Sequence, residues 1–125
     1  LACAAANANL AIVEAEDLPA RAVQIGEYFG GRLAELMRHA HVGEVRGKGM
    51  MWAAELVTDR ATREMMMPTS TYTRTLVNTA RENGAIIRVQ GNRLILSPPL
   101  VYTTADVDET LRILHDAFEA AERAA

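Results

Sequence analysis

The spacing of the apolar residues changes near His41, and this change constrains the fold more than any other feature of the sequence. Before it, apolar residues recur with the 3.6-residue period of an amphipathic helix, at Leu18, Ala22, Ile25, Phe29, Leu33 and Leu36. After it, residues 42–57 alternate between apolar and polar, as in a strand with one buried face. The chain must therefore combine helices with strands, with each kind of element burying its apolar side against the other.

The same patterns divide the whole sequence into eight elements. They are a helix over 2–15, a helix from Glu16 or Asp17 to about His39, strands over 42–46 and 50–57, a helix capped by Thr69 or Ser70 and ended by Asn83-Gly84, two short strands within 84–100, and a helix capped by Thr103 or Thr104. We predict the order ααββαββα, an α+β fold in which helices cover a small, mostly antiparallel sheet.

Glycines set two further expectations. Gly47-Lys48-Gly49 is predicted to form the hairpin turn between the first two strands, and 58–68 to form a polar loop. In the second helix, Gly26, Gly30 and Gly31 each weaken the helix by about 1 kcal/mol relative to alanine. Tertiary packing must therefore hold that helix in place.

Charge and cysteine content exclude several classes of partner. The net charge of −3 argues against a phosphate-binding surface, so nucleic acid is not an expected partner. No apolar run is long enough to span a membrane, and no signal segment opens the chain. Cys3 is the only cysteine, which excludes a disulfide framework or a cysteine-based zinc site within one chain and favours a reducing cytoplasm.

Arg88 is the leading candidate for a functional residue. It follows Ala85-Ile86-Ile87 in the first of the two late strands, and a permanent charge beside such an apolar run is costly unless an anion or hydrogen-bonded partner meets it. The planar guanidinium matches a carboxylate in shape and charge. The alternative is that Arg88 lies on the solvent face of an edge strand, as we expect for Arg93.

Other residue patterns predict no catalytic, cofactor-binding or metal-binding site. Lys48, the only lysine, lacks a complete phosphate-binding motif and sits in an exposed turn, where its amine would not be activated. His39 and His41 end the second helix without further metal ligands nearby in sequence, and His115 is expected on the solvated side of the last helix. Glu55 is expected to face solvent or to pair with an arginine.

Two segments indicate surfaces that a neighbour covers. The alanine-rich run 1–10 is helical in composition but has no N-cap and no initiator methionine, so we expect a piece of a longer polypeptide. The three adjacent methionines of 65–67 are typical of an irregular interface.

Several stretches together resemble the C-terminal small domain of class III aminotransferases, which are fold type I enzymes dependent on pyridoxal phosphate (PLP). They are residues 1–6, the arginine–glycine hairpin and following strand of 45–56, residues 84–88, Gly91, and Leu-Ser-Pro-Pro-Leu at 96–100. Each is weak alone, but their order and spacing are specific.

The resemblance implies a division of the chain and a parent enzyme. Residues 1–16 would be a helix leading in from a missing large domain, and 17–125 the small domain. The parent would be a cytoplasmic homodimer that transfers an amino group between an amino acid or amine and a 2-oxo acid. The family's Schiff-base lysine and its other PLP-binding groups belong to the large domain, so the 125-residue chain alone is expected to be inert and not to bind PLP.

The resemblance also implies a role for two residues. The arginine that matches Arg88 binds the substrate carboxylate in many members, and Gly91 would be the turn residue that lets this segment approach the active site. Two alternatives remain open. The parent could be an aminomutase or racemase of the same scaffold, or the chain could be a stand-alone α+β module that binds a small ligand.

Overall fold

The computed structural model describes residues 1–125 and confirms the predicted α+β class and order of elements. The structure adds two short elements. One is a 3₁₀ helix that directly follows the second helix, and the other is a strand within 58–68, the segment that was predicted to be a loop. The helices are α1 (Ala2–Ala15), α2 (Leu18–Leu33), η1 (Ala34–Arg38), α3 (Thr71–Glu82) and α4 (Thr104–Ala124). The strands are β1 (Val42–Lys48), β2 (Met51–Asp59), β3 (Glu64–Met65), β4 (Arg88–Gln90) and β5 (Arg93–Leu96).

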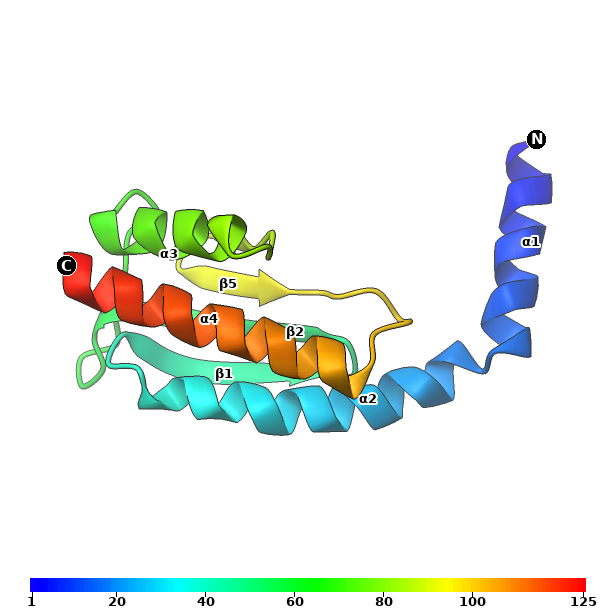
Figure 1. Ribbon diagram of the computed structural model, residues 1–125, viewed down its shortest axis with the longest axis horizontal. Coiled ribbons are helices and arrows are strands. Elements are labelled where there is room, and N and C mark those ends of the chain that lie inside the picture. The colour runs from blue at the N-terminus through cyan, green and yellow to red at the C-terminus, as the bar shows by residue number, and fades with distance from the viewer.

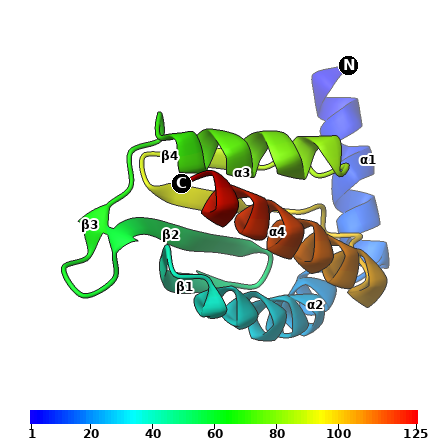
Figure 2. The same cartoon turned by 60° about the vertical axis from the view of Figure 1, so that its left-hand side comes forward.

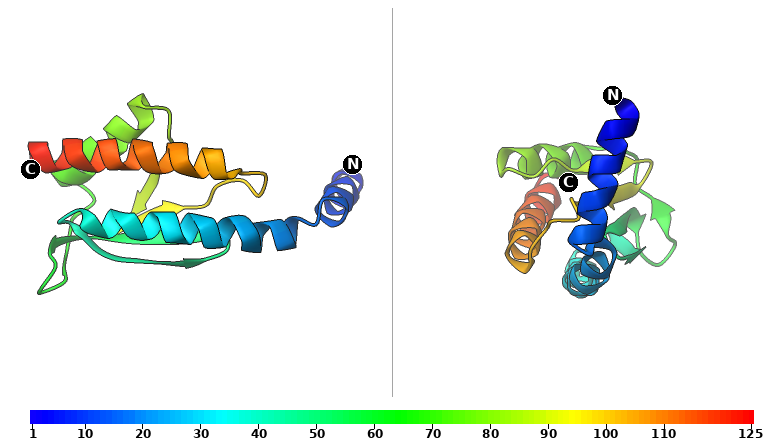
Figure 3. Two further views of the ribbon diagram at one scale, coloured as in Figure 1. Left: turned by 60° about the horizontal axis from the view of Figure 1, so that its bottom comes forward. Right: turned by 90° about the vertical axis from the view of Figure 1, so that its right-hand side faces the viewer.

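The sheet is antiparallel throughout, with the order β1-β2-β5-β4, and β3 pairs with the end of β2. Helices α2 and α4 lie side by side on one face of it (Figures 1 and 3). Helix α3 packs against α4, and the edge strand β4 runs beside α3 (Figure 2). The opposite face of the sheet carries no helix of this chain (Figure 3).

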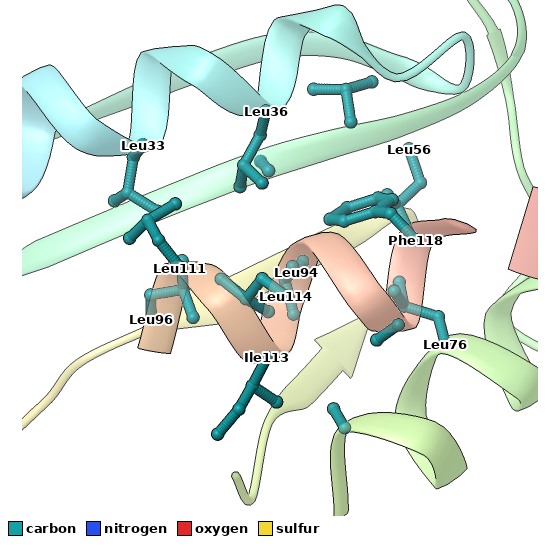
Figure 4. Packing of buried hydrophobic residues seen from close by; sticks show 14 of the residues in the cluster. Leu33, Leu36, Leu56, Leu76, Leu94, Leu96, Leu111, Ile113, Leu114 and Phe118 are labelled. Atoms are coloured by element: carbon teal, nitrogen blue, oxygen red, sulfur yellow. The ribbon is translucent and has the colours of Figure 1, made fainter. Parts of the chain in front are cut away.

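The core fills the space between the sheet and these helices. Leu56 and Leu94 project from the sheet toward Leu111, Leu114 and Phe118 of α4 (Figure 4), and all five are fully buried. Burying a side chain of this size stabilises the fold by about 1.5–3 kcal/mol. The predicted apolar stripes of α2, α3 and α4 therefore face one common core.

Capping residues fix both ends of α3 and so position β4. Of the two predicted caps, Ser70 is the one used, and its Oγ accepts a hydrogen bond from the Thr73 amide at 3.1 Å. At the other end Gly84 has φ +99°, which lets the Ala85 amide bond back to the Ala80 carbonyl at 2.8 Å. The chain thus turns sharply from α3 into the segment that leads to Arg88.

The β1–β2 turn begins two residues later than the sequence predicted, and of the three predicted turn residues only Gly49 belongs to it. Strand β1 continues through Lys48, and the turn is Gly49-Met50, with φ +55° at Gly49. Gly47 is required for a different reason, because a Cβ there would collide with Trp52 and the Met51 carbonyl on the paired strand. The prediction was wrong because glycine serves close approach as well as turns.

Close approach also accounts for two of the three glycines in α2. A Cβ at Gly26 would overlap the backbone of Gly49, and one at Gly30 would overlap the ring of Trp52. Helix α2 therefore lies directly on the β1–β2 turn, and this contact compensates for the low helix propensity of glycine. A Cβ at Gly31 would meet nothing within 4 Å.

Helix α1 projects from the body of the chain and buries none of its residues (Figure 1). Leu10 and Ile12 are among its exposed apolar side chains. In the methionine cluster, Met66 is in the core, whereas Met65 and Met67 are exposed. No helix of the chain combines the length and apolar composition needed to cross a membrane.

Two histidines, of which His115 was expected to be solvated, join the end of η1 to α4. His39 is 4% exposed and stacks on Phe118, with ring centroids 4.8 Å apart. Its Nδ1 lies 3.2 Å from Glu122 Oε1 and its Nε2 lies 2.9 Å from His115 Nδ1. The expectation for His115 was wrong because it faces η1, an element that extends the helical segment past Leu33 and brings His39 over α4.

Burial lowers the pKa of both histidines in this pair. For His39, desolvation outweighs the opposing attraction of Glu122, and for His115 the nearby Arg38 adds to the effect of desolvation. A lowered pKa means that the folded chain favours the neutral rings, while the unfolded chain takes up protons near pH 6.5.

The glycine contacts predict opposite effects for the same substitution at two positions of α2. Gly26→Ala should lower the free energy of unfolding by about 1–3 kcal/mol, because the added methyl group overlaps the Gly49 backbone. Gly31→Ala should leave it unchanged or raise it by up to about 1 kcal/mol, through helix propensity alone. Urea unfolding followed by Trp52 fluorescence measures both. Equal stability of the two variants would contradict the close approach.

The histidine pair predicts a stability that falls with acidification. As the pH drops below about 6.5, the unfolded chain binds protons that the folded pair resists, so the free energy of unfolding should decline until the pH passes the folded pKa values. The free energy of unfolding should fall by no more than about 1.4 kcal/mol per pH unit for each proton that the unfolded chain takes up. Urea unfolding at pH 5 to 8 measures it. The double variant His39→Gln/His115→Gln should flatten the profile, and an unchanged slope would contradict the assignment.

Candidate functional site

The candidate site lies on the face of the sheet that the helices leave uncovered. Val89 pairs with Leu94, which is buried under the helices, so the neighbouring residues of β4, Arg88 and Gln90, point to the opposite face. On that face the register aligns Arg88 with Ile95 of β5, Ala53 of β2 and Arg46 of β1. A guanidinium therefore stands at each edge of the sheet with small and apolar side chains between them.

Arg88 is exposed on the edge strand, at the first residue of β4. Its side chain forms one hydrogen bond, from Nη2 to Gln90 Oε1 at 3.2 Å, and no ion pair with any carboxylate of the chain. Because the guanidinium is exposed, its charge is not buried and needs no anion from this chain to stabilise it. The guanidinium is instead free to bind a carboxylate from elsewhere.

Arg88 also lines an open depression of about 410 Å³ between α3 and β4. Arg74 and Asn78 of α3 lie on its other side, and Val77 and Ile87 supply apolar surface. Two guanidinium groups and an amide around one depression form a surface suited to an anion with a short apolar part.

Gly91 has the conformation expected of the turn residue between β4 and β5, with φ +60°. The next residue, Asn92, is buried and was not singled out from the sequence. Its side-chain amide donates to the Leu56 carbonyl at 3.2 Å, and its own carbonyl accepts from the Leu56 amide at 2.7 Å. The turn is thus fastened to β2, which fixes the position of the strand that carries Arg88.

Arg46, at the other edge of the sheet, differs from Arg88 because it is paired with carboxylates of the chain. Its guanidinium lies 2.7 Å from Glu55 Oε1 and 3.0 Å from Glu44 Oε2. Glu55 therefore pairs with an arginine, which was one of the two roles expected for it. Arg93 is exposed as expected but lies on the inner strand β5, opposite Glu55 and Gln90 in register, and forms no ion pair.

The structure places no cluster of metal ligands near Arg88. The structure brings together no set of three or more His, Cys, Asp or Glu side chains that could hold a metal ion. Lys48, the only lysine of the sequence, is exposed at the end of β1. Gln90 is the residue at this site that the sequence analysis missed. Its position two residues after Arg88 in a predicted strand was the available signal, since such residues share a face.

Comparison with known proteins identifies the family. The profile of the aminotransferase class-III family matches residues 1–118. The chain is 42% identical over 112 residues to a diaminobutyrate–2-oxoglutarate transaminase of Halomonas elongata, covering 87% of the chain and 24% of the relative. It is 37% identical over 123 residues to an isoleucine 2-epimerase of Lentilactobacillus buchneri, covering 96% of the chain and 27% of the relative.

A solved structure is equally similar. The crystal structure of an amine transaminase from an uncultivated Pseudomonas species, in a PLP-bound form, superposes with a TM-score of 0.90 at 42% identity, covering 99% of this chain and 28% of that one. The chain thus spans about a quarter of the length of the relatives it matches. On the extent of the profile match and these identities, the chain belongs to the class III aminotransferase family.

Proposed function

We propose that this chain is the C-terminal small domain of a PLP-dependent class III transaminase. The parent enzyme transfers an amino group between an amino acid or amine and a 2-oxo acid, and Arg88 binds the substrate carboxylate. The observation that carries this proposal is the Arg88 guanidinium itself, which stands on the uncovered face of the sheet without a carboxylate partner. A planar donor of this kind binds a carboxylate through two parallel hydrogen bonds.

Three features support the division into domains, with 1–16 as the lead-in helix and 17–125 as the small domain. The chain covers only about a quarter of its relatives. Helix α1 buries no residue, and Met65 and Met67 are exposed, so each offers apolar surface to a neighbour. In the proposal that neighbour is the large domain of the same polypeptide, in a cytoplasmic homodimer.

The residues of this chain do not fit PLP. A Schiff-base lysine must be desolvated or otherwise lowered in pKa to act, and Lys48 is exposed at a strand end. In the proposal the cofactor therefore belongs to the large domain, and this domain contributes recognition of the carboxylate and closure over the cleft. Gly91 contributes by its φ of +60°, which forms the turn that holds β4 in place.

Replacing Arg88 should separate the two halves of the reaction. In the full-length enzyme, Arg88→Ala should lower kcat/KM for a 2-oxo acid such as pyruvate by about a hundredfold, the scale expected when one partner of a hydrogen-bonded charge pair is removed. The reaction with benzylamine, which has no carboxylate, should change by no more than about threefold, because it makes no use of the guanidinium. Single-turnover kinetics of each half-reaction measures the difference.

Arg93→Ala is the matched control, since it removes the same charge from the same face of the sheet on the adjacent strand. It should leave both half-reactions within about threefold of the parent enzyme, because Arg93 does not line the depression between α3 and β4 that Arg88 lines. Equal losses on pyruvate and benzylamine in Arg88→Ala would disprove the role of Arg88.

The isolated 125-residue chain should be catalytically inert and should take up no stoichiometric PLP. Its only lysine is exposed, so the cofactor has no desolvated amine to bind. Absorbance titration with PLP, followed by borohydride reduction and mass measurement, checks this. Saturable attachment of one cofactor per chain would contradict the assignment of the cofactor to another domain.

A second candidate function is isomerisation on the same scaffold, as in an amino-acid racemase or an aminomutase. The specific observation in its favour is the similarity to the isoleucine 2-epimerase. The 37% identity to this epimerase is close to the 42% identity to the diaminobutyrate–2-oxoglutarate transaminase. A transaminase consumes a 2-oxo acid in each turnover, whereas an isomerase needs none. Activity of the full-length enzyme on an amino acid without any added 2-oxo acid would favour the isomerase.

A further inference from the structure

The depression between α3 and β4 contains a second guanidinium besides that of Arg88. Arg74 lines it from α3, and no carboxylate is among the residues around it. Arg74 forms no ion pair, and the side-chain hydrogen bonds at the start of α3 are those of Ser70 and Thr73. Like Arg88, Arg74 therefore has no anion of this chain beside it.

Helix α3 presents Arg74 together with an amide and an apolar side chain. Val77 and Asn78 follow Arg74 by three and four residues, a spacing that puts all three on one face of the helix. All three line the depression, and Ile87 lines it from the segment that leads into β4. The depression of about 410 Å³ thus has a positive group on each of two elements and apolar surface as well.

A short connection of five residues, 83–87, fixes β4 relative to α3. Gly84, with φ +99°, turns the chain there, and the Ala85 amide donates to the Ala80 carbonyl at 2.8 Å. Strand β4 then runs beside α3 (Figure 2). The backbone therefore holds both arginines beside one depression, and a ligand would find them already in place.

The local charge favours an anion in this depression. Residues 71–96 contain four arginines and one acidic residue, Glu82, which gives this segment a net charge of +3 in a chain whose net charge is −3. Positive charges that lie close together repel one another, and a bound anion relieves that repulsion. A single carboxylate occupies one guanidinium fork. Two forks with apolar surface beside them instead suit a short carbon chain with a carboxylate at each end.

We infer that Arg74 is a specificity-determining residue and that the amino acceptor of the parent enzyme is a dicarboxylic 2-oxo acid. The inference rests on the proposed role of Arg88, which binds one carboxylate, and it assigns the second carboxylate to Arg74. The Asn78 amide donates to this second carboxylate, and the carbon chain lies against Val77 and Ile87. A monocarboxylic acid such as pyruvate engages Arg88 alone.

Removing the second guanidinium tests this in the full-length enzyme. Arg74→Ala should lower kcat/KM for 2-oxoglutarate by about tenfold, the scale of one hydrogen bond to a charged group. The value for pyruvate should change by no more than about twofold, because pyruvate does not engage Arg74. Arg74→Lys keeps the charge but loses the planar fork, so it should lower kcat/KM for 2-oxoglutarate by about threefold. Single-turnover kinetics of the acceptor half-reaction measures each value.

Two controls separate direct recognition from a general effect of charge or chain length. Arg81→Ala removes the same charge from the same helix, at an exposed residue that does not line the depression. It should leave kcat/KM for both acids within about twofold of the parent enzyme. The acid 2-oxohexanoate is of similar length to 2-oxoglutarate but has no second carboxylate. The parent enzyme should use it about tenfold less well than 2-oxoglutarate, and Arg74→Ala should abolish that preference.

The outcome for Arg88 separates this inference from the proposal on which it rests. If Arg88→Ala leaves pyruvate kinetics unchanged, the role of Arg88 fails and the inference fails with it. If Arg88→Ala impairs the reaction with pyruvate, the role of Arg88 stands and Arg74 is judged alone. Equal losses on 2-oxoglutarate and pyruvate in Arg74→Ala, a loss on 2-oxoglutarate below about twofold, or the same loss in Arg81→Ala would then overturn the role of Arg74.

Discussion

The sheet is covered by helices on one face only, and the arrangement of its charged residues depends on that division. Alternation along each strand sends Leu56 and Leu94 into the core, and it sends Arg88 and Gln90 to the other side. A shift of one residue in the pairing of β4 would bury the guanidinium and expose Val89. The packing that stabilises the fold thus also determines which side chains are available to a substrate.

Much of this arrangement could be predicted because it follows from local rules. The periods of apolar residues, the Ser70 cap and the Gly91 turn identified the elements and placed Arg88 on the late strand pair. The predictions failed where one residue type serves two purposes or where contacts are distant in sequence. Gly47 is needed for close approach rather than for the turn, and His39 meets His115 on α4 although the two lie 76 residues apart in the sequence.

Arg46 and Arg88 show that residue type and exposure do not define a binding group. Both are arginines at the edges of one sheet face, but Arg46 lies between two glutamates, and Arg88 contacts only the amide of Gln90. The sequence could not distinguish them, because it did not fix the β1–β2 register that brings Glu55 beside Arg46, whereas Arg88 has only Gln90 beside it. In the proposed enzyme, the difference leaves Arg88 rather than Arg46 ready for a substrate carboxylate.

The central claim is that this chain acts as one domain of a larger PLP-dependent transaminase. The most direct test is the intact mass of the natural gene product after borohydride reduction in the cell extract. The account predicts a mass several times that of the 13.6 kDa chain, carrying one reduced pyridoxyl group per polypeptide. An unmodified species near 13.6 kDa would contradict it and would favour a domain that works alone by binding a small ligand.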